Sequence, residues 1–385
     1  MPDADAIAHS ERLIGRLIER IEESGGVLPF DAYMQACLYE PGLGYYSAGA
    51  VKLGAEGDFV TAPEISPLFG RTLAHHAVAL FAQGLAPALL EFGAGSGRLC
   101  RDLLLELDRL EVVPDRYAIL ETSPDLRQRQ RELLSSALPT GLFDRVEWLD
   151  ALPQGFSGLA LGNEVLDAMP VKVVHKQGVW RELGVGFEQG RFVWKPLSPQ
   201  MSSVPVLDEI RRIDWQYGLP DGYATEINPN YEPWLRALHE SGESLAVLLI
   251  DYGYPESLYY HPSRVSGTLQ CFYRHRVHGD PFVYPGLQDI TAFVDFDALA
   301  RAASAVGFEV AGIVNQADFL LGNGLLDLAA DGGDALTQLQ LAQQVKTLTL
   351  PAEMGEKFKC MALVKGIDLD FPGLHPGTAT RSYNG

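Results

Sequence analysis

The sequence predicts an α/β fold in which helices pack on both faces of a doubly wound, mainly parallel β-sheet. Short apolar strands alternate with helical segments between residue 89 and about residue 174. Three carboxylates also stand at strand ends, and in open parallel sheets the carboxyl edge of the strands forms the ligand crevice. We therefore expect a ligand site at this edge of the sheet.

The N-terminal region is predicted to contain one helix and an irregular lobe. Apolar residues recur at helical spacing from Ile7 to Ile21, and Gly25 and Gly26 end the helix. Residues 30–70 are rich in aromatic side chains and glycine, which favours an irregular lid over regular elements.

A glycine turn follows the first strand of the sheet. It has the pattern E-x-G-x-G-x-G, formed by Glu91, Gly93, Gly95 and Gly97. Glycine has no Cβ atom, so the backbone can turn sharply and approach a ligand closely. Arg98 stands where the dinucleotide fingerprint needs glycine, which disfavours a pyrophosphate at the helix N-terminus. S-adenosylmethionine (SAM) fits better, because it has no phosphate and its cationic methionine end suits a carboxylate. An ordinary tight turn is the alternative.

The next two strands also end in carboxylates. The strand 117–120 ends at Glu121, about two dozen residues past the last glycine, a spacing typical of an acidic residue that accepts ribose hydroxyls. The strand 146–149 ends at Asp150, which we expect to meet the adenine amino group. The alternative is that both residues cap the helices that follow.

Polar side chains follow the fourth strand, around residue 159. Asn163, Glu164 and Asp167 lie just past its carboxyl end, where a substrate atom must meet the SAM methyl group. We expect Asn163 to contact the cofactor. Helices are predicted after Ser96, Pro124 and Glu164.

An insertion of hairpins is predicted between residues 172 and 196. Its two turns are placed at Gln177-Gly178 and Gln189-Gly190, and a helix follows at residues 207–217. These turns and the helix interrupt the alternation of strands and helices that builds the sheet.

The sheet is predicted to resume after the insertion. Residues 245–250 form a continuous apolar run, typical of a strand buried on both faces. A helix at 296–306 and strands near residue 308 and at 358–364 bring the sheet to seven strands. The predicted segments are an N-terminal helix and lid lobe (1–85), the first part of the core (86–175), the insertion (176–240) and the second part of the core (241–385).

Composition favours a soluble enzyme. The chain has 385 residues and a formal charge of −20, with 50 acidic and 30 basic side chains. This balance argues against nucleic acid or an anionic membrane as a partner and suits a cationic substrate. The four cysteines form no C-x-x-C pair, which indicates neither disulfides nor a zinc site and favours the cytoplasm. We expect no membrane span and no signal peptide.

One stretch combines histidine, aspartate and arginine in the sequence RHRVHGDPF. His275, His278 and Asp280 have the side chains of a metal site. Arg274 and Arg276 would repel a dication, and SAM transfer needs none, so no metal is predicted. We expect these residues to line the substrate entrance or to stabilise a loop.

Several sequence blocks run in order through nearly the whole chain: YMQACLYEPGLGYY, GDFVTAPEISPLFG, LEFGAGSGRL, LGNEVLDAMPV, LLIDYGYP, YYHPSRVSGTLQCFYRHRVHGDPF, FLLGNGL and MGEKFKCMAL. Together they resemble the MidA-like methyltransferases. Departures are small, at Ala62, Pro67 and Arg71. The resemblance implies a class I, Rossmann-like SAM-dependent methyltransferase with a seven-stranded sheet. For the mitochondrial members it implies symmetric dimethylation of an arginine on the quinone-site subunit of respiratory complex I.

The resemblance to arginine methyltransferases implies a role for the residues after the fourth strand. Guanidinium stays charged in proteins, so the enzyme must orient its nitrogen while the proton leaves during or after transfer. A carboxylate can bind two guanidinium N–H groups in a planar fork. Glu164 is our first choice for this catalytic role and Asp167 the second. Alternatively, Asp167 caps a helix and Glu164 bonds its own turn.

The segment around Thr61 and Glu64 is expected to close over SAM. The hydroxyl and carboxylate suit the methionine amino group or the ribose, and Phe59 would shield the sulfonium. The alternative is a simple cap for a helix that starts near Ser66.

Three function classes follow from these observations: a protein arginine N-methyltransferase, a methyltransferase for a small molecule or another side chain, and a SAM-binding assembly factor that acts through partner binding. The lid and the insertion favour a bulky protein substrate. An arginine-containing protein is therefore the expected partner, and the resemblance to MidA-like proteins implies a complex I subunit.

Overall fold

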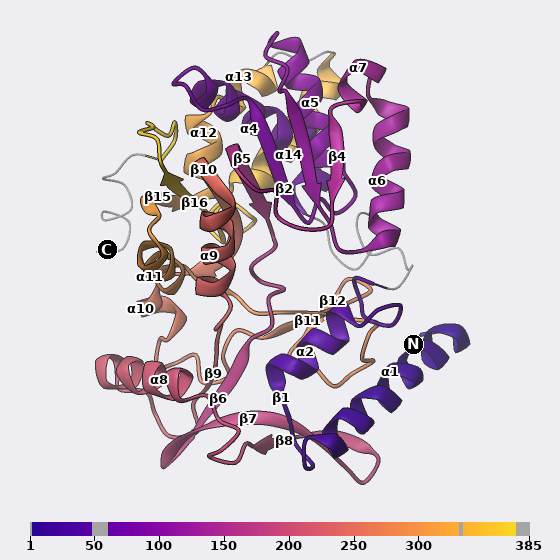
Figure 1. Cartoon of the computed structure of the whole chain (residues 1–385), viewed down its shortest axis with the longest axis vertical. Helices are drawn as coiled ribbons and strands as arrows, with labels where there is room; N and C mark the ends of the chain where they lie inside the picture. The colour runs from indigo at the N-terminus through magenta and orange to yellow at the C-terminus, as the bar shows by residue number, and fades with distance from the viewer. Residues whose placement is uncertain (1, 48–60, 331–333, 375–385) are drawn as a thin grey trace.

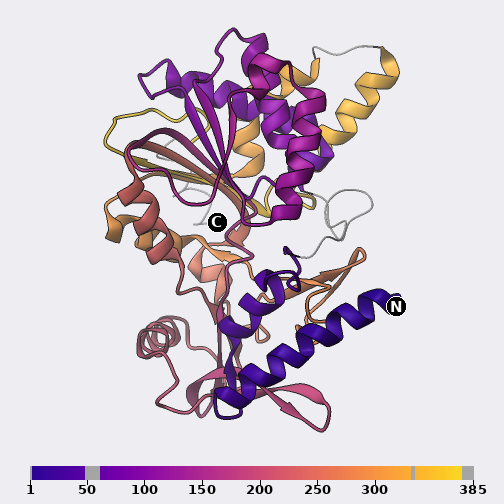
Figure 2. The ribbon, with the colours of Figure 1, turned by 45° about the vertical axis from the view of Figure 1, so that its right-hand side comes forward.

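The computed structural model describes residues 2–47, 61–330 and 334–374, which form two lobes (Figure 1). The upper lobe in this view contains the main sheet with helices on both of its faces. The lower lobe contains a smaller sheet and the helices α1 (Ala4–Glu23), α2 (Phe30–Tyr39) and α8 (Val204–Tyr217). Figure 2 shows α1 running along the lower lobe.

The main sheet has the seven predicted strands in the order β15-β16-β10-β5-β2-β3-β4, and the short strand β14 also pairs with β10. The strands from β10 to β4 are parallel, whereas β16 and β15 form an antiparallel edge. The bounds are β2 (Ala88–Phe92), β3 (Arg116–Leu120), β4 (Val146–Leu149), β5 (Phe156–Asn163), β10 (Gly242–Tyr254), β14 (Val294–Asp295), β15 (Glu309–Asn315) and β16 (Phe358–Lys365). The strand order reverses between β2 and β5, and ligands bind at such switch points.

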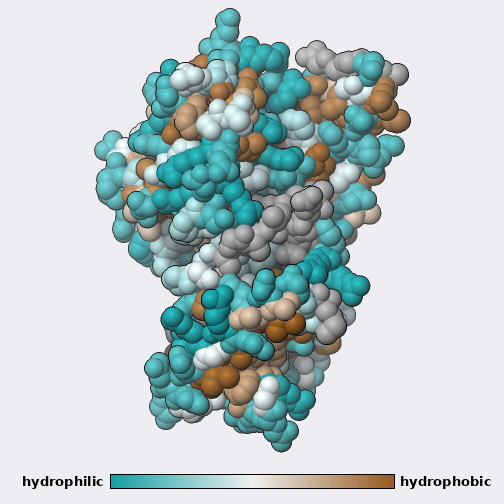
Figure 3. Space-filling view, turned by 90° about the vertical axis from the view of Figure 1, so that its right-hand side faces the viewer, coloured by the Kyte–Doolittle hydropathy of each residue, from teal (hydrophilic) through white to brown (hydrophobic). Residues whose placement is uncertain are grey.

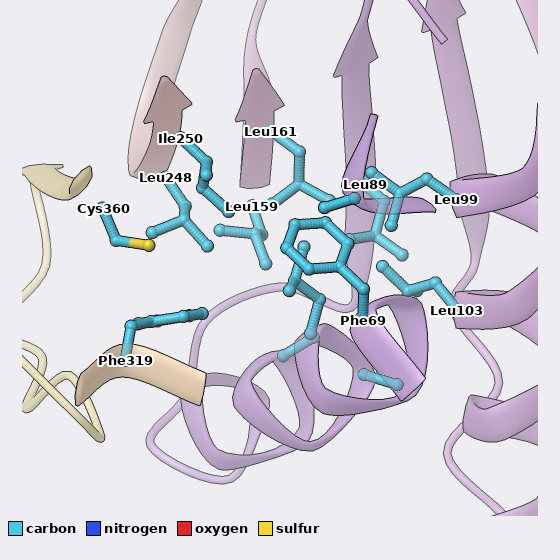
Figure 4. Close-up of a cluster of buried hydrophobic side chains, with 14 of the residues drawn as sticks. Phe69, Leu89, Leu99, Leu103, Leu159, Leu161, Leu248, Ile250, Phe319 and Cys360 are labelled. Atoms are coloured by element: carbon cyan, nitrogen blue, oxygen red, sulfur yellow. The ribbon is translucent and has the colours of Figure 1, made fainter. Parts of the chain in front are cut away.

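Helices bury an apolar core on each face of this sheet. On one face, Phe69 and Leu103 pack against Leu89, Leu159 and Leu248 (Figure 4). Helices α9 and α11 pack together over the other face. The bounds are α3 (Ala62–Ile65), α4 (Pro67–Phe81), α5 (Arg98–Arg109), α6 (Pro124–Ala137), α7 (Thr140–Phe143), α9 (Tyr231–Ser241), α10 (Glu256–Tyr259), α11 (Phe296–Val306), α12 (Gln316–Gly322), α13 (Leu325–Ala330) and α14 (Ala335–Thr349). Residues of β10 alternate between the two cores, which explains its continuous apolar run.

The lower lobe is built from separate stretches of the chain. One sheet has the order β1-β7-β6-β9, with β8 also paired to β7, and a second sheet has the order β12-β11-β13. The bounds are β1 (Leu28–Pro29), β6 (Lys172–Gln177), β7 (Val179–Glu188), β8 (Arg191–Pro196), β9 (Ala224–Ile227), β11 (Gln270–Tyr273), β12 (Arg276–His278) and β13 (Asp289–Thr291). The predicted hairpin turns are confirmed, with positive φ at Gly178, Gln189 and Gly190. The division of the chain into the four predicted segments stays a prediction.

Two expectations about helices are wrong. The first half of the predicted irregular lid contains α2, because four side chains fall on one helical face and are buried in the lower-lobe core: Phe30, Tyr33, Met34 and Cys37. No helix follows Glu164, whose φ of 54° lies in the left-handed region, and the chain turns there before it reaches β6.

Phe59, which we expected to shield the sulfonium of SAM, lies outside the described residues.

The surface is largely hydrophilic on the face that Figure 3 shows, with apolar side chains scattered over both lobes. Exposed examples include Leu336 and Leu339 of α14. Within the ranges that the structure describes, no helix is long and apolar enough to cross a membrane.

Candidate functional site

A cavity of about 970 Å³ lies at the carboxyl ends of β2, β3 and β5, at the switch point of the main sheet. The lower lobe contributes part of its lining, including Tyr39, Gly42 and Tyr46, so the cavity lies between the two lobes. Most of the predicted site residues line it: Thr61, Glu64, Glu91, Gly93, Gly95, Glu121, Asn163 and Glu164.

The glycine turn has the backbone that its sequence pattern predicts. Gly93, Gly95 and Gly97 have φ values of 58°, 53° and 86°, a region that side-chain-bearing residues rarely adopt. The N–H of Gly93 donates to the carbonyl of Leu120 at 3.0 Å, which ties the turn to β3. Gly97 does not line the cavity. It caps α5, and a Cβ atom there would lie 3.4 Å from the side chain of Gln130, so this glycine serves packing.

Glu91 is a buried carboxyl group beside the glycine turn. Burial raises its pKa to about 7, although the Tyr117 hydroxyl, which donates to Glu91 Oε2 at 2.7 Å, partly opposes this shift. Desolvated carboxylates of this kind favour a cation as their neighbour, because an opposite charge restores the ionised form.

Glu121 lies at the end of β3 in a fixed orientation. Its Oε1 accepts the N–H of Ser123 at 2.9 Å, and its Oε2 accepts Nε2 of Gln130 at 3.2 Å. Burial raises the pKa of Glu121, and these hydrogen bonds limit the shift. The same Gln130 amide donates to the carbonyl of Gly95 at 2.9 Å, so one side chain connects the glycine turn with Glu121.

The short helix α3 carries Glu64, and Thr61 directly precedes this helix; both residues line the cavity. Glu64 accepts a hydrogen bond from the Ser96 hydroxyl and forms an ion pair with Arg98 Nε at 3.1 Å. Thr61 precedes α3 without a side-chain capping bond, so the capping alternative is not realised for its hydroxyl.

The structure does not support the predicted adenine contact of Asp150. Its side chain is 92% exposed, forms an ion pair with Arg127 at 2.6 Å and does not line the cavity. Reasoning from strand ends missed other lining residues. Thr122 directly follows Glu121 and Asp125 lies in the first turn of α6, so both could have been inferred from the end of β3. Trp234 of α9 reaches the cavity through tertiary packing alone.

Glu164 occupies a strained turn at the end of β5. It has a φ of 54° without being glycine, and its N–H donates to the carbonyl of Ile250 on β10 at 2.8 Å. Asn163 Nδ2 donates to Glu164 Oε1 at 3.2 Å. Burial, together with the nearby carboxyl group of Asp167, raises the pKa of Glu164 to about 8. Strained conformations of this kind persist where the surrounding structure enforces them, and they are concentrated at functional sites.

Asp167 lies behind this turn and does not line the cavity. It is buried, its Oδ2 accepts the Tyr252 hydroxyl at 2.6 Å, and burial raises its pKa to about 6. Asp251 is the neighbouring buried carboxyl group. Its Oδ2 accepts the N–H groups of Leu166 at 2.9 Å and Asp167 at 3.3 Å. No local sequence pattern predicts that Asp251 holds this turn.

Comparison with known proteins identifies the family. The family model described as "Putative S-adenosyl-L-methionine-dependent methyltransferase" matches residues 72–314. The chain belongs to this family. It is 31% identical to the mouse mitochondrial protein arginine methyltransferase NDUFAF7, over 96% of this chain and 87% of that protein. The Drosophila melanogaster homolog is 30% identical, over 95% and 88%.

A solved structure from Burkholderia thailandensis, bound to S-adenosyl-homocysteine, matches this methyltransferase with a TM-score of 0.92 at 44% identity and covers 99% of both chains. The cofactor of this methyltransferase is SAM. The lining fits it, since a glycine turn and several carboxylates suit a cationic ligand without phosphate. Among the lining residues that the structure describes, Arg98 is the basic one, and its charge is paired with Glu64.

Proposed function

We propose that this methyltransferase transfers the methyl group of SAM to an arginine nitrogen of a protein. The observation that carries the proposal is the acceptor-rich end of β5. Glu164 presents a carboxyl group at the cavity, and the neighbouring Asn163 Oδ1 is buried without a hydrogen-bond partner among the described residues. A guanidinium group has five N–H donors and no acceptor, so it matches such a site.

In this proposal Glu164 binds two guanidinium N–H groups and leaves another nitrogen directed at the methyl carbon. Asp167 is a positioning residue in our revised assignment, because it supports the turn from behind and does not reach the cavity. SAM supplies the electrophilic methyl group. The acceptor nitrogen loses its proton during or after methyl transfer, and in this proposal Glu164 receives that proton.

The raised pKa of Glu164 links acceptor binding to proton release. A guanidinium cation beside Glu164 favours its ionised form, so below pH about 8 binding of the acceptor displaces a proton from this residue. Acceptor affinity should therefore increase with pH up to about 8.

For the cofactor, we propose that Glu121 accepts the ribose hydroxyls and that Glu91 and the turn at Gly93 and Gly95 hold the methionine end. Thr61 and Glu64 would close this side of the cavity, and Asn163 would contact the cofactor next to the transferred methyl group. These assignments are supported by the common lining of one cavity.

The acceptor that we propose is a subunit of the respiratory complex I type, at its quinone site. Its support is the resemblance to MidA-like proteins and the names of the curated relatives, which are called protein arginine methyltransferases and mitochondrial. For this chain we propose the cytoplasm, since all four of its cysteines are free and buried.

Incubation of the purified protein with labelled SAM and a lysate of its source cells tests the proposal. We expect one labelled protein band, with methylated arginine identified by mass spectrometry. Label on lysine, on carboxylates or on a metabolite would instead support the second function class. Tight SAM binding with a stable partner complex and no methyl transfer would support an assembly factor.

A further inference from the structure

The three-stranded sheet of the lower lobe carries an exposed group of basic side chains. Tyr273 at the end of β11 pairs with Arg276 at the start of β12, so Arg274 and His275 form a two-residue turn between them. Arg274, His275 and Arg276 are all exposed, and we call them the basic tip. They follow one another directly in a chain whose formal charge is −20.

The conformation of this turn is unfavourable for its residues. Arg274 and His275 have φ values of 47° and 60°, both in the region that favours glycine. The hairpin of β7 and β8 provides a matched comparison, because Glu188 pairs with Arg191 around the turn Gln189-Gly190, with φ values of 50° and 79°. That turn has glycine at its second position. The β11–β12 turn instead has Arg274 and His275 at these positions. Residues held in unfavourable backbone conformations are concentrated at functional sites, which indicates a function for these two side chains.

The basic tip lies close to the cavity along a continuous set of contacts. Tyr46 lines the cavity, and its hydroxyl donates to Asp289 Oδ2 at 2.9 Å. Asp289 pairs with Phe272 across β13 and β11, and the turn begins two residues further on, about 7 Å along the strand. Figure 2 shows this hairpin, in orange, next to α1, and Arg274 lies 3.9 Å from Asp3 just before that helix.

We propose that the basic tip binds acidic residues that flank the acceptor arginine of a protein substrate. This inference rests on the proposed function, in which the acidic cavity receives the arginine. Opposite charges at the cavity and at the tip would select an arginine within an acidic segment and fix the direction in which that segment lies. A nucleic acid is disfavoured as the partner, because the phosphate backbone would be repelled by the net charge of the chain.

Peptide binding tests the proposal. Two fluorescein-labelled peptides share one central arginine, and the flanking positions carry glutamate in one and glutamine in the other. Fluorescence anisotropy is measured at low salt with saturating S-adenosyl-homocysteine. We expect the full-length protein to bind the glutamate peptide roughly 3- to 10-fold more tightly, as two exposed ion pairs permit, and the preference to decline as salt is added.

Two variants locate the preference. Arg274→Gln combined with Arg276→Gln removes the charges, and Arg274→Asn combined with His275→Gly converts the turn to a sequence that favours its backbone. The first variant should reduce the preference toward 1-fold, and the second, which keeps Arg276, should reduce it part of the way. Both should leave the affinity for S-adenosyl-homocysteine unchanged. The turn variant should unfold at the same temperature as the parent protein or a higher one. Arg191→Gln, at the matched hairpin, is the control and should keep the preference.

Equal affinity of the parent protein for both peptides, or a preference that survives in both tip variants, would overturn the proposal. Tighter binding of a labelled single-stranded RNA than of the glutamate peptide, lost in the tip variants, would also overturn it in favour of nucleic acid. A third peptide with lysine in place of the central arginine separates the two hypotheses. If that peptide binds equally well and is methylated in a separate assay with SAM, the arginine assignment fails while the role of the basic tip stands.

Discussion

At the residue level, burial sets the charge of the acidic groups in the site. The pKa values of Glu91 and Glu164 are raised to about 7 and about 8, chiefly by desolvation. Glu106 on α5 shows the opposite outcome: burial opposes ionisation, but hydrogen bonds from Arg109 and Arg71 lower its pKa to about 2. Glu106 has its cationic partners within the fold, whereas Glu91 and Glu164 form no ion pair with the residues that the structure describes, so a cationic ligand would favour their ionised forms.

Glu121 provides a test of the ribose contact. Glu121→Ala should weaken SAM binding by about 1.5–3 kcal/mol, the usual loss for hydrogen bonds to a charged acceptor. Titration calorimetry measures the affinity, and thermal unfolding provides the control. A lower unfolding temperature with normal affinity per folded molecule would make Glu121 a structural residue instead.

Glu164 provides a test of acceptor orientation. Glu164→Gln keeps the size of the side chain but removes the charge that binds a guanidinium, so turnover should fall at least about 100-fold with SAM affinity changed only a few fold. Single-turnover methyl transfer and calorimetry measure the two quantities. Turnover within a few fold of the parent protein would contradict the role of Glu164.

The same substitution should stabilise the protein at alkaline pH. A folded-state pKa of about 8, against an ordinary value of 4.5, means that the folded state holds the proton more tightly than the unfolded state. The contribution of Glu164 to the stability of the wild type is therefore fully present below pH about 4.5 and is lost as the pH rises toward 8. Glu164→Gln avoids this loss, so its unfolding temperature should exceed that of the wild type by about 2–6 °C at pH about 8.5 and by little at pH about 5.

Exposed Glu240 on α9 is the control for this pH dependence, and Glu240→Gln should shift the unfolding temperature equally at both pH values. A Glu164→Gln variant that is less stable than the wild type at alkaline pH would show that the charged carboxylate is satisfied within the fold.

At the level of elements, the end of β10 holds the turn that follows β5. Ile250 accepts the N–H of Glu164, Asp251 accepts the N–H groups of Leu166 and Asp167, and Asp251 Oδ1 accepts the N–H of Tyr252 at 2.9 Å. These bonds occupy backbone groups that a helix after β5 would use. They explain why a strand–turn connection replaces the predicted helix and why Glu164 can be kept at positive φ.

Asp251→Asn tests this support. The amide offers one acceptor oxygen in place of two, so it cannot satisfy all three N–H groups, and kcat should fall about 10- to 100-fold with SAM affinity unchanged. Steady-state kinetics with an arginine acceptor separates kcat from KM. Tyr252→Phe, which removes the hydroxyl whose hydrogen bond Asp167 accepts, should give a smaller loss. Equal activity of Asp251→Asn and wild type would exclude Asp251 as a positioning residue.

At the level of the whole molecule, the cavity depends on both lobes. Tyr39, Gly42 and Tyr46 of the lower lobe face the glycine turn and Glu164 of the upper lobe across the cavity. A ligand bound there contacts segments far apart in the sequence, so its binding energy should stabilise the lobes together.

S-adenosyl-homocysteine should therefore raise the unfolding temperature of both lobes in one shifted transition. At 100 times its Kd the stabilisation is about 2.7 kcal/mol, and scanning calorimetry measures it. Glu121→Ala should need a higher ligand concentration for the same shift. Two separate transitions, of which only one responds to ligand, would show that the lobes unfold independently and that the lower lobe does not hold the cofactor.

Local sequence patterns are sufficient to predict the main sheet and the part of the cavity around the glycine turn. The positive φ values of Gly93 and Gly95 favour glycine at these positions, and burial on both faces of the sheet explains the continuous apolar run of β10. Short-range sequence patterns are therefore sufficient to predict both features. Glu91 and Glu121 were found in the same way, because carboxyl ends of parallel strands always meet at one edge.

The conformation at the end of β5 depends on contacts between segments far apart in the sequence. The turn at Glu164 depends on hydrogen bonds that Asp251 accepts from the N–H groups of Leu166 and Asp167, which lie 85 and 84 positions away in the sequence. Asp150 ends a strand as Glu121 does, yet an ion pair with Arg127 holds it outside the cavity. Local patterns cannot distinguish such cases, because the free energy that fixes each side chain comes from partners brought together by the fold.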